Sequence, residues 1–259
     1  MLRDYHVHTV FSDGADTPEA VAEAAFQRGF AALGFSDHSH TDFDLSYCMR
    51  RAQYAEYRAR IAALKAQYAG KLEILCGIEQ DGFSDEPTDG FDYVIGSLHY
   101  LSIGGEFVEV DGSADILRAA AAQHFGGDIL SLAECYYETL AECIPRTRPD
   151  IIGHFDLISK FNEGDALFPS SDARYRAAWQ AAADALLTLS VPFEVNTGAM
   201  SRGYRLSPYP SGEIITYLAE KGAKFLLSSD SHSAGTVGYA FGEARALVPA
   251  GALLDGLQI

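Results

Sequence analysis

The sequence is poor in basic residues. It has 19 lysines and arginines against 36 aspartates and glutamates, which gives a formal net charge of −17. A surface of this sign repels phosphate backbones and anionic lipids, so we expect neither long nucleic acid nor a membrane as a partner. Bound cations would offset part of this negative charge.

The chain also lacks long apolar runs and closely paired cysteines. No apolar segment is long enough to span a bilayer, and residues 1–4 lead into an expected strand rather than a signal peptide. The 4 cysteines show no CxxC spacing. We therefore expect reduced thiols and a cytoplasmic location.

Nothing in the composition divides the chain. No break in composition, no linker rich in proline, glycine or serine, no low-complexity tract and no short repeat interrupts the 259 residues. With 48% hydrophobic residues the chain can bury a full core. We expect one domain over residues 1–259, and no sequence feature fixes an oligomeric state.

Strand-like and helix-like segments alternate along the sequence, which indicates a mainly parallel sheet with crossover helices. The expected strands are 2–8, 30–36, 72–78, 93–97, 151–153, 192–195 and 224–229. The expected helices are 17–28, 51–68, 114–143 with an interruption near 124–127, 172–189, 212–221 and 236–244. About seven βα units favour a (β/α)7 barrel over an open sheet.

The first expected strand ends in two histidines that are one residue apart. Residues i and i+2 of a strand point to the same face, so His6 and His8 can aim at one point. Asp13 can return there from the following loop. Two imidazoles and a carboxylate suit zinc, manganese or iron. The alternative is a strand end that carries two surface histidines.

Other strand ends repeat this pattern and favour the metal site. Active sites of such barrels lie at the C-terminal ends of the strands. The ligand-type residues expected there are His6, His8, Asp13, His38, Glu79, His99, His154, Asp230 and His232. They exceed the needs of one ion, so we expect two or three divalent ions with one bridging carboxylate. Closely spaced ions serve phosphoryl transfer.

These strand-end motifs resemble, in order and spacing, those of the PHP (polymerase and histidinol phosphatase) superfamily. The motifs are His6-Val7-His8, Ser36-Asp37-His38, Gly77-Ile78-Glu79, Ser97-Leu98-His99, Gly153-His154-Phe155-Asp156 and Ser229-Asp230-Ser231-His232. The resemblance covers nearly the whole chain. It implies a distorted (β/α)7 barrel, with a trinuclear metal site at the C-terminal ends of the strands.

The resemblance also implies a distribution of the ligands. One ion would be held by His6, His8, Glu79 and Asp230, a second by Glu79, His99 and His154, and a third by Asp13, His38 and His232. Within the superfamily the chain is most similar to the histidinol-phosphate phosphatases, through segments 156–162, 194–198 and 202–211. It departs from them at Lys160, where arginine is expected, and in a longer segment 196–205.

The resemblance implies a metal-dependent phosphomonoesterase that acts on a small phosphorylated metabolite. The leading reaction is hydrolysis of L-histidinol phosphate to L-histidinol and phosphate in histidine biosynthesis, by attack of a hydroxide held by the ions. One alternative is a broader phosphoesterase acting on other small phosphomonoesters or nucleotides. The other is a non-catalytic metal-binding regulatory domain, which the intact ligand set disfavours.

Several further residues are candidates for substrate contact. Arg202 and Arg205 offer planar donors to phosphoryl oxygens, and Lys160 offers a point charge there. Asp81 could meet a substrate ammonium group because it follows a ligand residue. The alternative for the arginines is a solvated loop position.

The expected catalytic groups include two of the metal ligands, Asp230 and His232, together with Arg202 and Arg205. His40 could protonate the leaving group or touch phosphate. Its alternative is an ordinary loop histidine.

Overall fold

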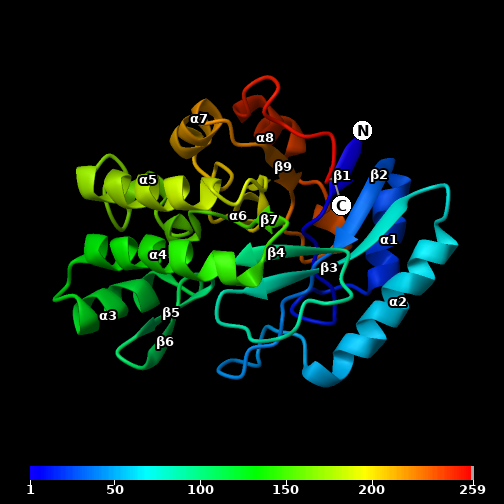
Figure 1. The fold of residues 1–259 in the computed structure, drawn as a ribbon, viewed down its shortest axis with the longest axis horizontal. Coiled ribbons are helices and arrows are strands. Elements are labelled where there is room, and N and C mark those ends of the chain that lie inside the picture. The colour runs from blue at the N-terminus through cyan, green and yellow to red at the C-terminus, as the bar shows by residue number, and fades with distance from the viewer. Residues whose placement is uncertain (258–259) are drawn as a thin grey trace.

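The computed structural model describes residues 1–257 and contains a parallel sheet in the spatial order β1-β2-β3-β4-β7-β8-β9 (Figure 1). Its strands are β1 (Leu2–Asp4), β2 (Phe30–Phe35), β3 (Glu73–Asp81), β4 (Tyr93–Ser97), β7 (Ile151–Ile152), β8 (Phe193–Asn196) and β9 (Phe225–Ser228). Beyond the ends of β1 and β9, Val7 and Ser231 form a parallel bridge. This bridge brings the two edges together, so the fold is the distorted (β/α)7 barrel that was expected.

Helices surround this sheet, and α4 and α5 lie side by side (Figure 1). The α-helices are α1 (Pro18–Gln27), α2 (Tyr54–Gln67), α3 (Ala114–His124), α4 (Ile129–Cys143), α5 (Ala173–Leu187), α6 (Gly198–Ser201), α7 (Gly212–Glu220) and α8 (Phe241–Leu247). Short 3-10 helices occupy Arg51–Gln53, Ile144–Thr147, Leu157–Ser159, Glu163–Asp165 and Ala234–Thr236. The start of α1 follows the expected chemistry: Thr17 accepts a hydrogen bond from the Ala20 N–H, and Pro18 is the first helical residue.

Most element boundaries shift by only a few residues from the sequence prediction, and the differences at β1, β3 and α8 are the clearest. Strand β1 ends at Asp4, whose carboxylate accepts hydrogen bonds from the N–H groups of His6 and Ser229. Strand β3 continues to Asp81 because it pairs with β4 over its whole second half, so Glu79 lies within the strand. The last helix, α8, begins at Phe241 rather than near residue 236.

A hairpin of β5 (Tyr100–Ile103) and β6 (Glu106–Glu109) was not among the expected elements. Its turn is Gly104-Gly105, and both glycines have positive φ angles. A Gly-Gly pair between two short apolar segments is a hairpin signal, so the sequence did contain it. The hairpin lies beside α3 (Figure 1).

The barrel interior holds its own apolar core, separate from the core between sheet and helices. Its buried members are Tyr5, Ala32, Leu75, Tyr93, Ile95, Ile151 and Leu226. The Tyr93 hydroxyl donates to the backbone carbonyls of Tyr5 and Phe35. These side chains fill the interior of the barrel and so support the polar strand ends.

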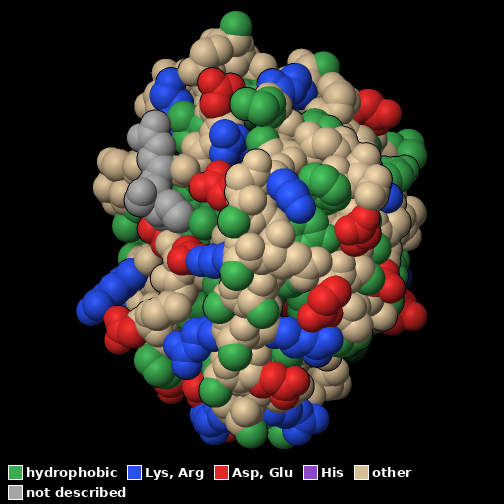
Figure 2. Space-filling model, turned by 90° about the vertical axis from the view of Figure 1, so that its right-hand side faces the viewer, with side chains coloured by type: hydrophobic (Ala, Val, Ile, Leu, Met, Phe, Trp, Pro, Cys, Tyr) green, Lys and Arg blue, Asp and Glu red, His purple; other side chains and the backbone are tan. Residues whose placement is uncertain are grey.

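The outer surface over α1 and α2 carries no special concentration of charge. Figure 2 shows acidic and basic side chains interspersed there with single apolar ones, and no histidine among the described residues on this face. Pairs such as Arg60 with Glu19 link the two helices. None of the helices described is both long and apolar enough to cross a membrane.

The glycines around Tyr93 give a test of the inner core. A Cβ at Gly77 would overlap the Tyr93 ring, so we expect Gly77→Ala to lower the free energy of unfolding by about 1–3 kcal/mol. Gly242, in α8, has no heavy atom near its Cβ position, and Gly242→Ala is the matched control. Urea unfolding of both variants measures the difference; equal stability of the two would contradict this packing.

Candidate metal centre

The strand ends bring all the expected ligands into one cluster. Most of them lie in the turns that follow β1, β2, β4, β7 and β9, and one lies inside β3. They are His6, His8 and Asp13 after β1, His38 after β2, Glu79 in β3, His99 after β4, His154 after β7, and Asp230 and His232 after β9. Parallel strands place their carboxyl ends at the same edge, which explains why residues so distant in sequence meet.

One group of ligand atoms lies deep in the barrel. Nε2 of His6 is 3.1 Å from Glu79 Oε2, and Nε2 of His8 is 3.5 Å from the same oxygen. Asp230 Oδ1 is 3.2 Å from His8 Nε2 and 3.8 Å from His6 Nε2. Two imidazole nitrogens and two carboxylate oxygens therefore converge where the first ion was expected.

The other carboxylate oxygen of Glu79 lies close to a second group of imidazoles. Oε1 lies 2.9 Å from His154 Nε2 and 3.4 Å from His99 Nε2. The two oxygens of one buried carboxylate thus face different sets of imidazoles. This is the arrangement that a bridging ligand between two ions requires.

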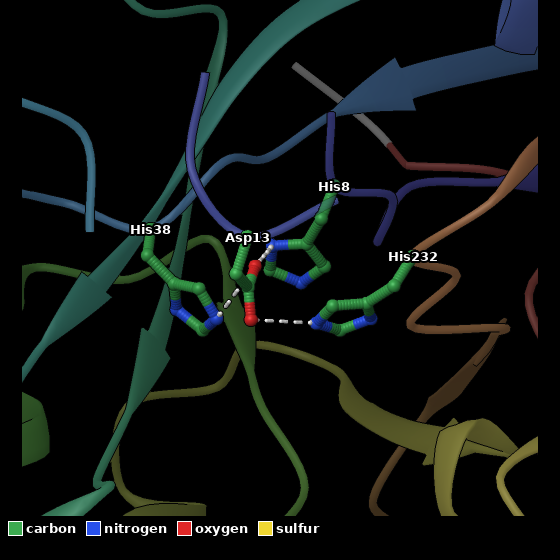
Figure 3. Close-up of side chains that lie close together, drawn as sticks. All are labelled: His8, Asp13, His38 and His232. Atoms are coloured by element: carbon green, nitrogen blue, oxygen red, sulfur yellow. Dashed lines mark hydrogen bonds and ion pairs between the residues drawn. The ribbon is translucent and has the colours of Figure 1, made fainter. Parts of the chain in front are cut away.

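The third group surrounds Asp13. Figure 3 shows its carboxylate between the rings of His8, His38 and His232. Asp13 Oδ2 lies 3.1 Å from His232 Nε2, and Oδ1 lies 3.7 Å from both His38 Nε2 and His8 Nδ1. His38 also links this group to Glu79, because its Nδ1 is 2.8 Å from Glu79 Oε2.

Several buried atoms of the cluster lie close to one another but form no hydrogen bond of suitable geometry within residues 1–257. They are His6 Nε2, both ring nitrogens of His8, and Glu79 Oε2. An unsatisfied buried polar atom costs about 1–3 kcal/mol, so such atoms are rarely left together. Cations bound between them would satisfy all of these atoms, and the donor set therefore fits divalent metal ions.

The electrostatics of the cluster suit cation binding. Burial, followed by the neighbouring His232 and His38, lowers the pKa of His8 to about 3, so its ring is neutral and can act as a ligand at neutral pH. Burial opposes ionisation of Glu79, but His6, His38 and His99 outweigh it and hold its pKa well below the usual range. The carboxylate is therefore charged and available.

A buried carboxylate that the sequence analysis left without a role orients His6. Glu194 Oε1 lies 2.6 Å from His6 Nδ1, and its Oε2 accepts hydrogen bonds from the His154 N–H and the Asn196 side chain. Burial lowers the pKa of His6, but Glu194, Glu79 and Asp230 outweigh it and raise the pKa well above its usual range. A bound cation would displace the proton on Nε2, while Glu194 would keep the proton on Nδ1. Carboxylates in this position fix the ring and raise its basicity.

Two aspartates hold other parts of the cluster. Asp81 Oδ2 accepts from the His99 N–H at 3.1 Å and lies 3.2 Å from His99 Nδ1. Asp37 accepts hydrogen bonds from Thr9 and Ser12 and so shapes the loop that leads to Asp13.

A cavity of about 200 Å³ opens over the ligands. Besides ligand residues it is lined by Tyr47, Tyr100, Glu109, Asp111, Leu157, Lys160, Arg202 and Tyr204. Among these, Lys160 and Arg202 were expected substrate contacts, and the sequence analysis gave no role to Tyr47, Glu109 or Asp111. The hairpin and the segment after it supply both acidic wall residues.

The structure places three of the expected substrate or catalytic groups outside this cavity lining. His40 is buried, with Nδ1 3.1 Å from the Met49 carbonyl oxygen and Nε2 3.1 Å from Asp42. Arg205 is buried beside Asp156 and donates to the Ser159 hydroxyl. The Asp81 carboxylate accepts a hydrogen bond from the His99 N–H, as described above. For these three the geometry favours structural contacts.

Arg202 lies at the edge of the cluster. Its guanidinium donates to Asp230 Oδ2 and to the Asp230 carbonyl oxygen, both at 3.1 Å, and Nη1 lies 2.9 Å from His232 Nδ1. It is the planar cation of the cavity lining, next to two expected ligands.

The hydrogen bond between Glu194 and His6 can be tested through metal affinity. We expect Glu194→Gln to weaken the binding of Zn²⁺ or Mn²⁺ by about 10- to 100-fold, because the amide orients His6 poorly and lowers its basicity. Chelator competition followed by mass-spectrometric metal analysis measures this. Glu220→Gln, at an outer helix end, is the control; equal metal affinity in both variants would rule out the orienting role.

Comparisons with known proteins agree with this geometry. The PHP domain family matches residues 4–198. A probable histidinol-phosphatase of Deinococcus radiodurans is 31% identical over 94% of this chain and 91% of its own length. A putative histidinol phosphatase of Listeria monocytogenes has the same fold, with a TM-score of 0.78, 21% identity, and coverage of 93% of this chain and 99% of its own.

A second solved structure is that of histidinol phosphate phosphatase from Lactococcus lactis in complex with zinc, L-histidinol and phosphate. It superposes with a TM-score of 0.69 and 22% identity, over 95% of this chain and 92% of its own. The family match spans most of the barrel, including the segments that supply His6 through Asn196. This chain belongs to the PHP domain family.

Proposed function

We propose that this chain is a metal-dependent phosphomonoesterase that hydrolyses L-histidinol phosphate to L-histidinol and phosphate. The observation that carries the proposal is the cluster of buried, unsatisfied imidazole and carboxylate atoms at the base of a small cavity. The names of the relatives support the substrate, and the Lactococcus lactis enzyme was crystallised with zinc, L-histidinol and phosphate.

The ligand set accommodates two or three ions of zinc, manganese or iron. His6, His8, Glu79 and Asp230 would hold one, Glu79, His99 and His154 a second, and Asp13, His38 and His232 a third. Bound there, divalent ions would lower the pKa of water and neutralise phosphoryl charge.

The chain's own residues would position the phosphoryl group. Arg202 carries five N–H donors, and only part of them is used by Asp230 and His232. Its planar fork suits two phosphoryl oxygens, whereas Lys160 offers a point charge that is already shared with Asp111. Hydrolysis breaks the bond between phosphorus and the alcohol oxygen of the substrate; water supplies the oxygen gained by phosphate and the proton gained by histidinol.

Steady-state kinetics test the substrate. With Zn²⁺, Mn²⁺ or Fe²⁺ added in turn, we expect kcat/KM for L-histidinol phosphate to exceed the values for other small phosphomonoesters and mononucleotides by about tenfold or more, since binding of the whole alcohol contributes to transition-state stabilisation. Similar values across the panel would indicate a broader phosphoesterase. A metal-loaded protein without hydrolysis of any member would indicate a non-catalytic domain.

Removal of a shared ligand tests the site. We expect His8→Ala and Glu79→Gln each to abolish turnover and to lower the bound metal, because both residues face more than one group of the cluster. Metal analysis gives a readout that does not depend on activity. His124→Ala, a histidine outside the cluster, should keep both metal and activity; full activity in either ligand variant would refute the assignment.

A further inference from the structure

Besides Leu157, Lys160 and Tyr204, the cavity lining has two chemically different parts. One part consists of ligand residues together with Arg202, which suits an anionic phosphoryl group. The other comes from the loop after β2 and from the hairpin, and it presents two aromatic rings and two carboxylates, Tyr47, Tyr100, Glu109 and Asp111. Carboxylates repel a phosphate group, so this second part of the lining suits a different group of the substrate.

The two carboxylates differ in their partners. Lys160 Nζ lies 3.1 Å from Asp111 Oδ2 and donates to the Asp111 carbonyl oxygen at 2.8 Å, so Asp111 is paired with a cation. The Glu109 carboxylate has no hydrogen bond or ion pair to any of residues 1–257. Burial and the nearby charges of Asp111 and Asp44 raise its pKa, and Lys160 and His99 offset this only in part. Glu109 is thus an uncompensated acid in the cavity wall.

The hairpin fixes where Glu109 points. Tyr100 and Glu109 are directly opposite each other in the antiparallel pair of β5 and β6. Cross-strand partners project to the same face, and both residues line the cavity. Phe107 of β6 stacks on Phe43 with ring centroids 3.9 Å apart, which ties the hairpin to the loop after β2.

The aromatic wall beside Glu109 is also held in place. The rings of Tyr47 and Tyr100 stack with centroids 5.8 Å apart and an interplanar angle of 29°. The Tyr100 hydroxyl donates to Asp44 Oδ2 at 2.6 Å. A flat apolar surface next to an unpaired carboxylate suits a ligand that has both a planar ring and a positive charge.

We propose that Glu109 binds the ammonium group of a phosphorylated amino alcohol, while Tyr47 and Tyr100 pack against its ring, so that this wall determines specificity for the alcohol. The proposal rests on the proposed function and names the residues that select its substrate. It replaces Asp81 as the acidic contact, because Asp81 holds His99 and does not line the cavity.

The test compares an amine-bearing substrate with a neutral one. For Glu109→Gln we expect kcat/KM for L-histidinol phosphate to fall about 10- to 100-fold, mainly through KM, because the hydrogen-bond acceptor of the ammonium group loses its negative charge. The kcat/KM for p-nitrophenyl phosphate should stay within about twofold, since that substrate has no ammonium group. Glu109→Asp, which keeps the charge, should retain part of the preference.

Glu106→Gln is the matched control on the same hairpin. Glu106 contacts Gln123 and His124 and does not line the cavity, so its variant should behave like wild type on both substrates. An equal loss on both substrates in Glu109→Gln, or no loss on the amine, would overturn the proposal. Metal analysis and thermal unfolding of the variant separate these outcomes from misfolding.

The wild-type protein provides a test that needs no variant. L-Histidinol should inhibit p-nitrophenyl phosphate hydrolysis at least tenfold more strongly than its analogue without the amino group, and equal inhibition would also overturn the proposal. Should the wild type fail to hydrolyse L-histidinol phosphate, the proposed function would fall. The Glu109 proposal would then be tested by comparing kcat/KM for ethanolamine phosphate with kcat/KM for ethyl phosphate. A higher value for the amine would support the proposal, and equal values would contradict it.

Discussion

The site depends on one buried carboxylate. Glu79 stands within β3 and directs its two oxygens to different sets of imidazoles, with His154 and His99 at one oxygen and His6, His8 and His38 at the other. A charged group with so little exposure is costly unless cations surround it. Protonated imidazoles can balance this charge, as at His38, where burial lowers the pKa but Glu79 and Asp13 outweigh it and raise the pKa to about 10; divalent ions bound between the ligands would take the place of those protons.

The scaffold keeps this carboxylate and its neighbours in place through hydrogen bonds from outside the cluster. Glu194 orients His6 and holds the backbone of His154, and Asp81 does the same for His99. Beneath them Tyr93 and the inner core fill the barrel. The ligands therefore lie within or just after the barrel strands, whereas the residues proposed to contact the alcohol lie on a hairpin and on a loop. This division lets the metal chemistry stay constant while specificity changes.

The sequence was sufficient for the barrel and for the convergence of the ligands. Alternating strand and helix patterns predict a parallel barrel, and polar residues at successive strand ends must then meet at one edge, as His6, His38 and His154 do. The strand limits were less accurate, because β3 extends through Glu79 by pairing with β4, a long-range effect that local propensity does not contain. The Gly104-Gly105 pair is a local hairpin signal, and the structure has a hairpin turn there.

The directions of side chains in loops could not be read from the sequence. Arg202 and Arg205 are three residues apart after a short helix, yet Arg202 faces the cluster and Arg205 is buried against Asp156. Asp81 follows Glu79 closely in the chain, but its carboxylate accepts a hydrogen bond from the His99 backbone N–H. The barrel topology fixes where successive strands end, so the meeting of the expected ligands could be predicted even though most of them lie just beyond a strand. The directions of Arg202, Arg205 and Asp81 depend on tertiary contacts that the sequence pattern does not contain.

The central claim is that Glu79 is shared between bound cations. Anomalous diffraction from crystals of the wild-type protein grown with Zn²⁺ or Mn²⁺ tests it directly. The account predicts separate anomalous peaks next to the two oxygens of Glu79, one near His6 and His8 and the other near His99 and His154. A map with no peak at either oxygen, at full metal concentration, would contradict it.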